Sequence, residues 1–437
     1  MRIFLCLLVI LMYFPLNSTA QTSPAVTPEF EAEHRRAVAL AHKDEHEKSL
    51  ALLRKLLKTN PTHYPTLRDY VIISTWNNDC DEALKYYKKI AKYPDQESYL
   101  IIPVSECMTE AGQLEQAKKL LISGLKKSPK DKDLNDALNE IQDEIDELNQ
   151  GILNVDLENN NPDGSNIEWR FQTKYTQPLT QAFAVYARYF FAHSSDEEFP
   201  TKDMNRLGIG AVIGLHQTLS LDQEFSTDIK DSNNYGSTTR LNYDPDELWN
   251  MNLGYTTYWE DLSLRAVFQE VKAKGWNYNV YFHTQDYRWD WFAALGDYQF
   301  TDDNHRSSVY TNGGYAFELT PKREQRVILE LDVGKNSVIP AAAYYNPERS
   351  STIALAYKLD MVLDTKYRRH VDTLYVTAGV YDQKDYDSDW VASVYYQQDY
   401  DFNKTTFFKW HLGVGSKVYD GERESNLLAK LNFEKRF

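Results

Sequence analysis

The chain has 437 residues and a formal net charge of −16, and its mean hydropathy of −0.59 is that of a polar polypeptide. This length allows two or more domains, and past residue 20 no apolar run is long enough for a membrane-spanning helix. The acidic balance and the lack of a basic patch exclude nucleic acid as the expected partner. Even so, the chain contains 31 Tyr, 19 Phe and 9 Trp residues.

The first 20 residues have the pattern of a secretory signal peptide. Arg2 supplies the positive charge, an apolar run follows, and Ser18, Thr19 and Ala20 form a small-residue cleavage site. The sequence therefore predicts a mature chain in the cell envelope that keeps Cys80 and Cys107. An oxidising compartment permits a disulfide between these two, and free thiols are the alternative.

Residues 21–150 read as helical repeats. The segments KLLKTNP, KKIAKYP and SGLKKSP end at Pro61, Pro94 and Pro129, a spacing close to the 34 residues of the tetratricopeptide repeat. The polar segment DKDLNDALNEIQDEIDELNQ suits a capping helix. We therefore expect an α-solenoid of about three repeats plus a capping helix in the periplasm.

Residues 151–437 alternate between apolar and polar positions, which is the period of β-strands. In SNIEWRFQTKYT, Ile167, Trp169 and Phe171 point one way, whereas Glu168 and Arg170 point the other. The same pattern recurs in TLSLDQEFS, REQRVILELDV, STIALAYKLDM, TFFKWHLGVG and LLAKLNFEKRF. A β-sandwich would also alternate, but long segments with aromatic ends in a secreted chain favour an outer-membrane β-barrel of a Gram-negative bacterium.

The spacing of turns and loops predicts sixteen antiparallel strands. Segments such as TQPL, DTKYRRH and FNK read as short periplasmic turns, and YDGERE and residues 334–351 as longer external connections. SLRAVFQEV is assigned to an external loop, because counting it as a strand would give seventeen. The chain ends in a strand at Phe437 because the last strand must pair with the first to close the sheet.

The alternation assigns a set of charged side chains to the lumen, which is wide enough in a sixteen-stranded barrel to be aqueous. The principal acids of the predicted polymer path are Asp222, Glu224, Glu330, Asp332, Asp360, Asp399 and Glu434, and further acids on these faces are Asp156, Glu158, Glu168 and Glu318. The bases are Arg170, Lys174, Arg240, Lys358, Lys409, Lys430 and Arg436. The excess of acids predicts a pore biased toward cationic cargo, although any single acid could serve only for solvation or ion pairing.

Two segments of the barrel region, IPAAAYYNPERS (339–350) and VYDGERE (418–424), resemble the outer-membrane porins that export poly-β-1,6-N-acetyl-D-glucosamine, the PgaA/HmsH type. RDYVIISTWNND (68–79) resembles the early repeats of that family. The resemblance implies a conduit for a partly deacetylated biofilm polysaccharide, with a periplasmic deacetylase, outer-membrane lipid and the barrel-assembly machinery as further partners. The repeat region here is much shorter than in that family, so another subunit is the alternative site for the deacetylase.

Two loop segments supply candidate polymer contacts. Tyr344, Tyr345, Asn346 and Arg349 combine aromatic faces with hydrogen-bonding groups, which suits sugars, and the alternative is a loop that folds inward to narrow the mouth. In the second segment, Asp420, Glu422, Arg423 and Glu424 are expected to pin a loop through internal ion pairs more than to touch polymer. Gly421 is expected to allow a tight turn.

Other chemistry is weakly indicated. The pair His42 and His46 and the acidic DQKDYDSD segment have metal-type side chains but lack a full ligand pattern, so no metal and no cofactor is predicted. No catalytic motif is present, and the chain is not expected to be an enzyme. The predicted function is export of the polysaccharide. A related channel for another polysaccharide or for lipoproteins, and an adhesin or structural barrel, are the alternatives.

Overall fold

A computed structural model describes residues 26–93, 97–161, 167–195, 202–230, 234–260, 262, 264–337, 344–363 and 369–437. The predicted signal peptide lies outside the described residues. The chain divides into two compact units, residues 1–146 and 147–437, and each is treated by itself.

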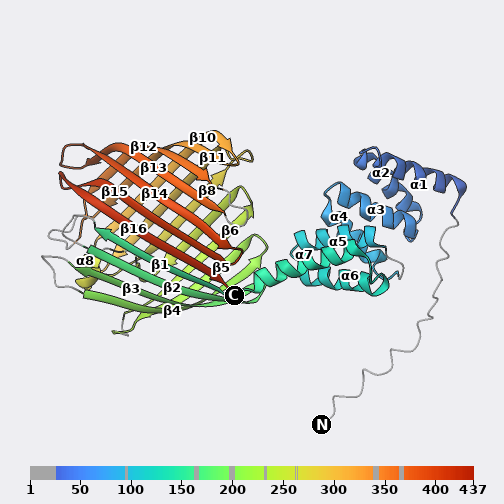
Figure 1. Cartoon of the computed structure of the whole chain (residues 1–437), viewed down its shortest axis with the longest axis horizontal. Coiled ribbons are helices and arrows are strands. Elements are labelled where there is room, and N and C mark those ends of the chain that lie inside the picture. The colour runs from blue at the N-terminus through green and yellow to red at the C-terminus, as the bar shows by residue number, and fades with distance from the viewer. Residues whose placement is uncertain are drawn as a thin grey trace, which may run out of the picture. The chain divides into compact units, whose positions relative to one another are not determined.

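The first unit contains helical hairpins, as the repeat spacing predicts. The helices are α1 (Pro28–Ala41), α2 (His46–Thr59), α3 (Tyr64–Trp76), α4 (Cys80–Ile90), α5 (Ser98–Glu110), α6 (Leu114–Lys127) and α7 (Lys132–Asn149) (Figure 1). α1 packs on α2, α3 on α4 and α5 on α6, and the polar α7 follows the third pair. The α-solenoid of three repeats and a final helix is confirmed.

A disulfide between Cys80 and Cys107 joins α4 to α5, with 5.2 Å between the two Cα atoms. Of the two states that the sequence leaves open, a disulfide and free thiols, the structure has the disulfide. Around it, one apolar core runs through the first repeats and includes the fully buried Leu53, Tyr70 and Ile90. Among the described residues, no helix combines the length and the apolar character needed to cross a membrane.

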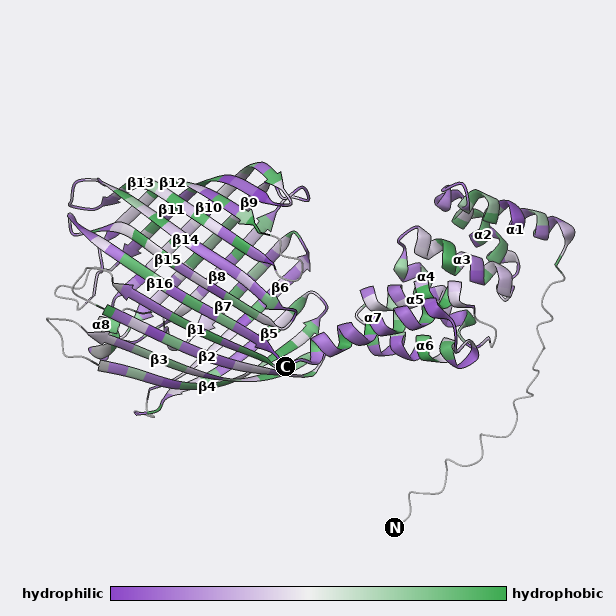
Figure 2. Cartoon of the chain, in the orientation of Figure 1, coloured by the Kyte–Doolittle hydropathy of each residue, from purple (hydrophilic) through white to green (hydrophobic). Residues whose placement is uncertain are grey.

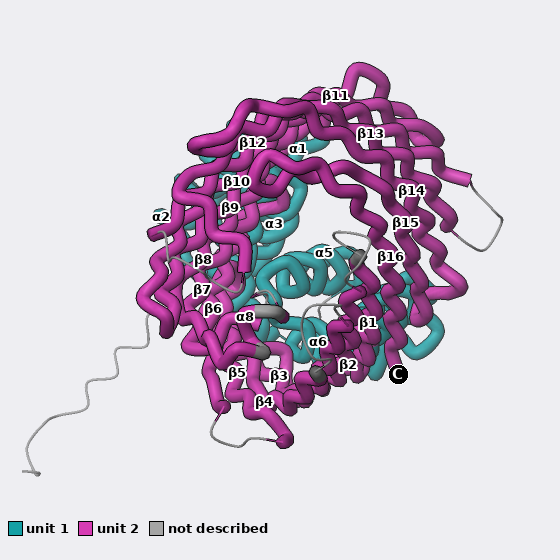
Figure 3. The backbone as a smooth tube through the Cα atoms, turned by 90° about the vertical axis from the view of Figure 1, so that its left-hand side faces the viewer, with its two compact units in different colours: residues 1–146 teal, residues 147–437 magenta. Residues whose placement is uncertain are grey.

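The second unit is a closed antiparallel barrel of sixteen strands, each paired with its neighbours in sequence (Figures 1 and 3). The first eight strands are β1 (Ile152–Asn161), β2 (Ile167–Thr180), β3 (Phe183–Ser195), β4 (Lys202–His216), β5 (Leu219–Asp228), β6 (Tyr235–Asp246), β7 (Trp249–Thr256) and β8 (Ala273–His283). The remaining strands are β9 (Trp289–Phe300), β10 (His305–Thr320), β11 (Arg323–Asn336), β12 (Arg349–Val362), β13 (His370–Gln383), β14 (Asp389–Asn403), β15 (Thr406–Tyr419) and β16 (Glu422–Arg436).

The last strand closes the barrel against the first, as predicted. β16 pairs with β1 in a register that runs from Ile152 opposite Arg436 to Asn161 opposite Leu427. Closure leaves no unpaired sheet edge, which is the condition for a sheet to lie in lipid.

The two faces of the barrel wall differ in polarity, and Figure 2 shows the resulting alternation along the strands. Outward side chains such as Ile209, Leu355 and Val414 are exposed by 68, 59 and 57 %. In water these exposures would cost free energy, whereas in a bilayer the same side chains contact lipid.

Two predicted connections are wrong. TQPL is not a turn, because β2 continues through Pro178 to Thr180, with a bulge that accommodates the proline. YDGERE is not a long connection. Asp420 and Gly421 alone join β15 to β16, both with positive φ (50° and 82°), as in the two-residue turns that fit the twist of a hairpin. SLRAVFQEV lies between β7 and β8 and contains the short helix α8 (Leu264–Phe268), so its exclusion from the strand count is confirmed.

The barrel lumen as candidate functional site

The connection between β7 and β8 (residues 257–272, of which 261 and 263 are not described) folds into the barrel, and Figure 3 shows α8 within the ring of strands. On one side, Tyr258 and Leu264 pack against Phe190 and Met204 of β3 and β4. On the other side, a second cluster joins the connection to β9 through Leu262, Ala266, Tyr298 and Phe300. We call this connection, together with β3, β4 and β5, the packed wall.

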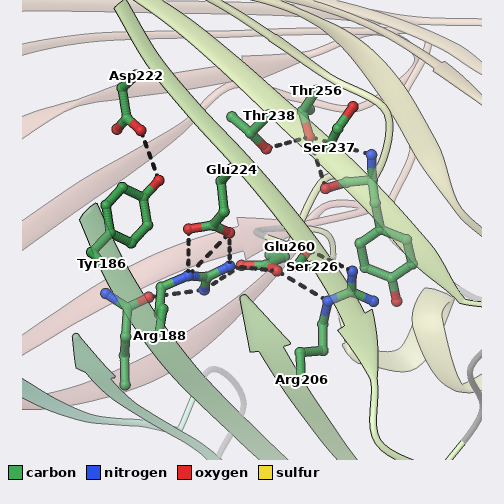
Figure 4. Close-up of polar contacts among 12 residues, drawn as sticks. Tyr186, Arg188, Arg206, Asp222, Glu224, Ser226, Ser237, Thr238, Thr256 and Glu260 are labelled. Atoms are coloured by element: carbon green, nitrogen blue, oxygen red, sulfur yellow. Dashed lines mark hydrogen bonds and ion pairs between the residues drawn. The ribbon is translucent and has the colours of Figure 1, made fainter. Parts of the chain in front are cut away.

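Two arginines hold the connection by one carboxylate, that of Glu260 (Figure 4). Arg188 Nη1 donates to Glu260 Oε2 at 2.7 Å, and Arg206 Nε donates to Glu260 Oε1 at 3.0 Å. Arg206 is fully buried, donates to Ser226 Oγ at 2.8 Å, and lies 3.7 Å from the centre of the Tyr258 ring. Burial by itself would raise the pKa of Glu260, but the hydrogen bonds from both arginines lower that pKa below its usual value.

Asp222 and Glu224, two acids of the predicted polymer path, belong to this packed wall. Arg188 Nε donates to Glu224 Oε2 at 3.0 Å, and the hydroxyl of Tyr186 donates to Asp222 Oδ1 at 2.7 Å (Figure 4). Their exposed fractions are only 9 and 6 %, respectively. The carboxylates of Asp222 and Glu224 therefore take part in contacts that hold the strands and the connection in place.

The lumenal faces of β10–β16 and β1, which we call the open wall, leave space. A cavity of about 710 Å³ is lined by residues of this wall that include Asp156, Gln397, Lys430 and Asn432, and also by Gln172 of the adjacent β2. A second cavity of about 580 Å³ shares Tyr395, Gln397, Lys409 and His411 with the first and adds Glu330 and Asp360. Charged groups and aromatic rings face these spaces together, an arrangement that suits a hydrated, hydroxyl-rich chain.

Most of the predicted acids on the open wall have a basic partner. Asp360 lies 2.7 Å from Lys358 Nζ, Asp399 lies 3.5 Å from Lys409 Nζ, and Glu434 lies 2.8 Å from Arg436 Nε. Similarly, Glu158 pairs with Lys430 at 3.0 Å.

Glu330 and Asp332 differ from these acids. In the part of the chain that the structure describes, no basic nitrogen lies within ion-pair distance of either. Both stand on β11, two positions apart, with Asp332 exposed and Glu330 half-buried. The negative charge of the open wall is therefore least compensated on β11.

The loop residues of the predicted polymer contacts are used in packing. Tyr344 stacks on Phe300 with 5.5 Å between ring centres, and its hydroxyl donates to Asp302 Oδ2 at 2.7 Å. The Tyr345 hydroxyl donates to Gln383 Oε1 at 2.6 Å, and Asn346 is half-buried beside it. These contacts favour a loop that folds against its neighbours, but residues 338–343 of the same segment lie outside the described residues.

The structure corrects the predictions for Arg349 and for the turn segment that contains Asp420, Glu422 and Arg423. Arg349 begins β12 opposite Lys335 and alternates with the lumenal Ser350, so it stands on the outer face of the wall and not in a loop. Arg423 does not pair within its own segment, since its guanidinium contacts Asp389 of β14. Asp420 Oδ1 accepts a hydrogen bond from Gln383 at 2.7 Å, and Glu422 is exposed. The turn is thus tied to the neighbouring hairpin.

Sequence reasoning missed the arginines of the packed wall and the aromatic residues of the open wall. Arg188 and Arg206 each stand at a polar position of a strand, so their lumenal direction follows from the alternation, but no sequence signal identifies Glu260 as their partner. Tyr310, Tyr375 and Tyr395 are also at lumenal positions and could have been found by extending the alternation to aromatic residues.

One group of metal-type ligand atoms lies together in the described residues, namely Cys80, Cys107 and Glu110. The two cysteines are joined to each other as a disulfide, so they offer no thiolate to a metal.

A closed barrel with an apolar outer face and a charged lumen defines an outer-membrane channel protein. Residues 153–437 match the family model of the PgaA membrane beta barrel domain, and the chain belongs to this family. The family predicted from the sequence is confirmed. Family and barrel make the chain a transport channel of the outer membrane, not an enzyme, with its helical unit in the periplasm.

Solved structures are similar to parts of the chain. A bacterial polysaccharide outer membrane secretin matches 66 % of this chain and 99 % of its own, with 19 % identity and a TM-score of 0.59. A loop-deletion mutant of OmpT from Vibrio cholerae matches 66 and 98 % at 11 % identity and a TM-score of 0.37. The Sgt2 TPR domain from Aspergillus fumigatus matches 29 and 84 % at 16 % identity and a TM-score of 0.26. No curated protein matches the chain.

Proposed function

We propose that this chain is an outer-membrane porin that exports poly-β-1,6-N-acetyl-D-glucosamine, partly deacetylated, along the open wall of the barrel. The observation that carries the proposal is the match of the barrel region to the PgaA family. The name of the similar solved structure, a polysaccharide secretin, supports a polysaccharide as the cargo.

The lumen supports this cargo through its two cavities. Aromatic faces pack on pyranose rings, while amides such as Gln397 and charged groups such as Lys409 bond to hydroxyls. The deacetylated units of the polymer carry amines that are cationic at neutral pH. Because Asp360, Asp399 and Glu434 have basic partners, the attraction for these amines would come mainly from β11.

The partners of this function are the polymer, outer-membrane lipid and the barrel-assembly machinery. A periplasmic polysaccharide deacetylase is a further partner for the helical unit. That unit leaves the large side chains of Trp76 and Tyr99 each 45 % exposed, and exposed aromatic side chains are common anchors of protein interfaces.

The test is complementation of a deletion strain, with surface β-1,6-glucosamine polymer as the readout. Gln397→Trp places an indole in both cavities and should reduce surface polymer, because it narrows the path. Leu412→Trp on the lipid face of β15 is the matched control, since Leu412 is 50 % exposed outward, and should export normally.

Normal surface polymer in the deletion strain would overturn the proposal. If the deletion strain lost adhesion alone, the barrel would be an adhesin. If it lost a different surface polysaccharide or a lipoprotein from the surface, the barrel would be a related channel for that cargo.

A further inference from the structure

Four lumenal rings form a row across the open wall, which we call the aromatic row: Tyr310 of β10, Tyr375 of β13, Tyr395 of β14 and His411 of β15. Tyr375 and Tyr395 stand directly opposite each other in the register, with 6.3 Å between ring centres. Tyr395 and His411 follow at 5.1 Å. All four residues line the same cavity of about 580 Å³.

Small residues beneath the rings allow this arrangement. β12, which lies between Glu330 and Tyr375, presents Ala354 and Ala356 to the lumen, so the Tyr375 side chain can cross that strand. Beside Tyr395 stands Gly413, where an added Cβ would come within 2.1 Å of the ring. The missing side chain at Gly413 therefore gives the Tyr395 ring the space that it occupies at the edge of the cavity.

The aromatic row is joined to one carboxylate. The hydroxyls of Tyr310 and Tyr375 both donate to the same oxygen of Glu330, Oε1, the former at 3.4 Å. Asn312 in turn donates to the Tyr310 hydroxyl at 3.0 Å. Two donors fix the direction of the carboxylate, while in the described residues no basic group neutralises it.

A second observation indicates a missing partner at this place. Nε2 of His411 is enclosed and has no hydrogen-bond partner among the described residues, although the imidazole lines both cavities. Enclosed polar atoms are normally hydrogen-bonded. Because Nε2 has no exposed surface, a ligand hydroxyl in the cavity would supply this partner once the imidazole turned toward it.

We propose that the aromatic row and Glu330 form a saccharide subsite for one amino-sugar unit, whose ring packs on the tyrosines and whose ammonium group binds Glu330. This inference rests on the proposed function and adds which unit of the polymer is recognised, and where. Lys358 and Lys409, which also line the cavity, are held by Asp360 and Asp399 and so oppose the ammonium group less than free lysines would.

The test uses the purified full-length protein in planar bilayers. The probes are a β-1,6-linked glucosamine pentasaccharide and its fully N-acetylated counterpart, and the readout is the dwell time of current blocks. Glu330→Gln should shorten the dwell time of the amine probe by roughly fivefold, the effect of losing one partly exposed ion pair. The N-acetylated probe should dwell as in the unaltered protein.

Two further variants separate the parts of the subsite. Tyr395→Leu should shorten the dwell times of both probes, because the ring would contact the sugar irrespective of its charge. The double variant Lys384→Gln with Glu348→Gln removes an exposed base and acid that pair with each other and line neither cavity, without changing net charge. It should leave both dwell times unchanged, and the gel shift between unheated and boiled samples checks that each variant is folded.

The outcomes are distinct. If the amine probe blocks the unaltered channel and Glu330→Gln does not shorten the dwell time of these blocks, the subsite is overturned and the export function still stands. An equal loss in Glu330→Gln and in the double variant would also overturn it, since removal of a charge anywhere in the barrel would then suffice. If neither probe blocks the unaltered channel and surface polymer is normal in the deletion strain, the proposed function fails as well.

Discussion

The packed and open walls of the lumen are built from the same kinds of residues and use them differently. On the packed wall, Arg188 and Arg206 are buried, and their charges are balanced by Glu224 and Glu260. On the open wall, pairs such as Lys409 with Asp399 are partly exposed beside a cavity. The difference is burial, because a buried charge must be paired to be tolerated, whereas a hydrated one can exchange its partner for a ligand.

The comparison therefore predicts that equal charge changes on the two walls have unequal effects. On the packed wall they should alter the stability of the connection, and on the open wall they should alter what passes through the channel.

The largest effect is expected from Glu260→Ala on the packed wall. The change leaves Arg206 buried without its carboxylate, which costs about 3–5 kcal/mol, so the connection should loosen. Single-channel conductance should rise, and the unfolding temperature of the barrel should fall. Gln269→Ala, an exposed change in the same connection, is the control. Unchanged conductance in Glu260→Ala would show that the apolar clusters alone hold the connection.

Acid should act on the same contact. Since the folded-state pKa of Glu260 is lowered, the carboxylate stabilises the connection fully above the ordinary glutamate range, about 4, and this stabilisation is lost as the pH falls through the folded-state value. Conductance measured against pH should therefore rise on acidification in the unaltered protein. Glu260→Gln should lack this step, and a step of equal size in both proteins would assign it to another group.

A smaller effect is expected from Gly413→Val on the open wall. Its Cβ would meet the Tyr395 ring, and such overpacking costs about 1–3 kcal/mol. Binding of both pentasaccharides should weaken through displacement of the ring, as dwell times would record. Gly313→Ala, where the nearest atom is 3.9 Å from the new Cβ, should change neither stability nor dwell time.

The smallest effect is expected from Glu158→Gln combined with Lys430→Gln. This pair is partly exposed on the open wall, so its removal should change the free energy of unfolding by only about 0–1 kcal/mol. Thermal unfolding and conductance should match those of the unaltered protein. A loss comparable to that of Glu260→Ala would contradict the distinction between the walls.

Part of what the sequence missed was present as a local signal. The Asp420 and Gly421 dipeptide is typical of a two-residue hairpin turn, and it predicts the short connection better than the charge of YDGERE does. At Pro178 the local signal was misleading. A proline near a strand end usually marks a turn, so TQPL was predicted to be one, whereas a bulge in β2 accommodates this proline within the strand.

The sequence by itself determined the solenoid, the sixteen strands and the closure of β16 on β1. These features follow from local periods of about 34 residues in the repeats and two residues in the strands. Each segment shows its period independently of the others. It also determined which face of a strand meets the lumen, because alternation fixes that direction.

Only the tertiary structure decided which lumenal charges are paired. Glu260 lies 72 residues from Arg188 and 54 from Arg206, and the alternation of a strand contains no information about a partner brought in by a distant connection. The same applies to Glu330, whose tyrosine donors come from β10 and β13. Side chains meet across a lumen through the curvature and register of the whole barrel, which no single segment specifies.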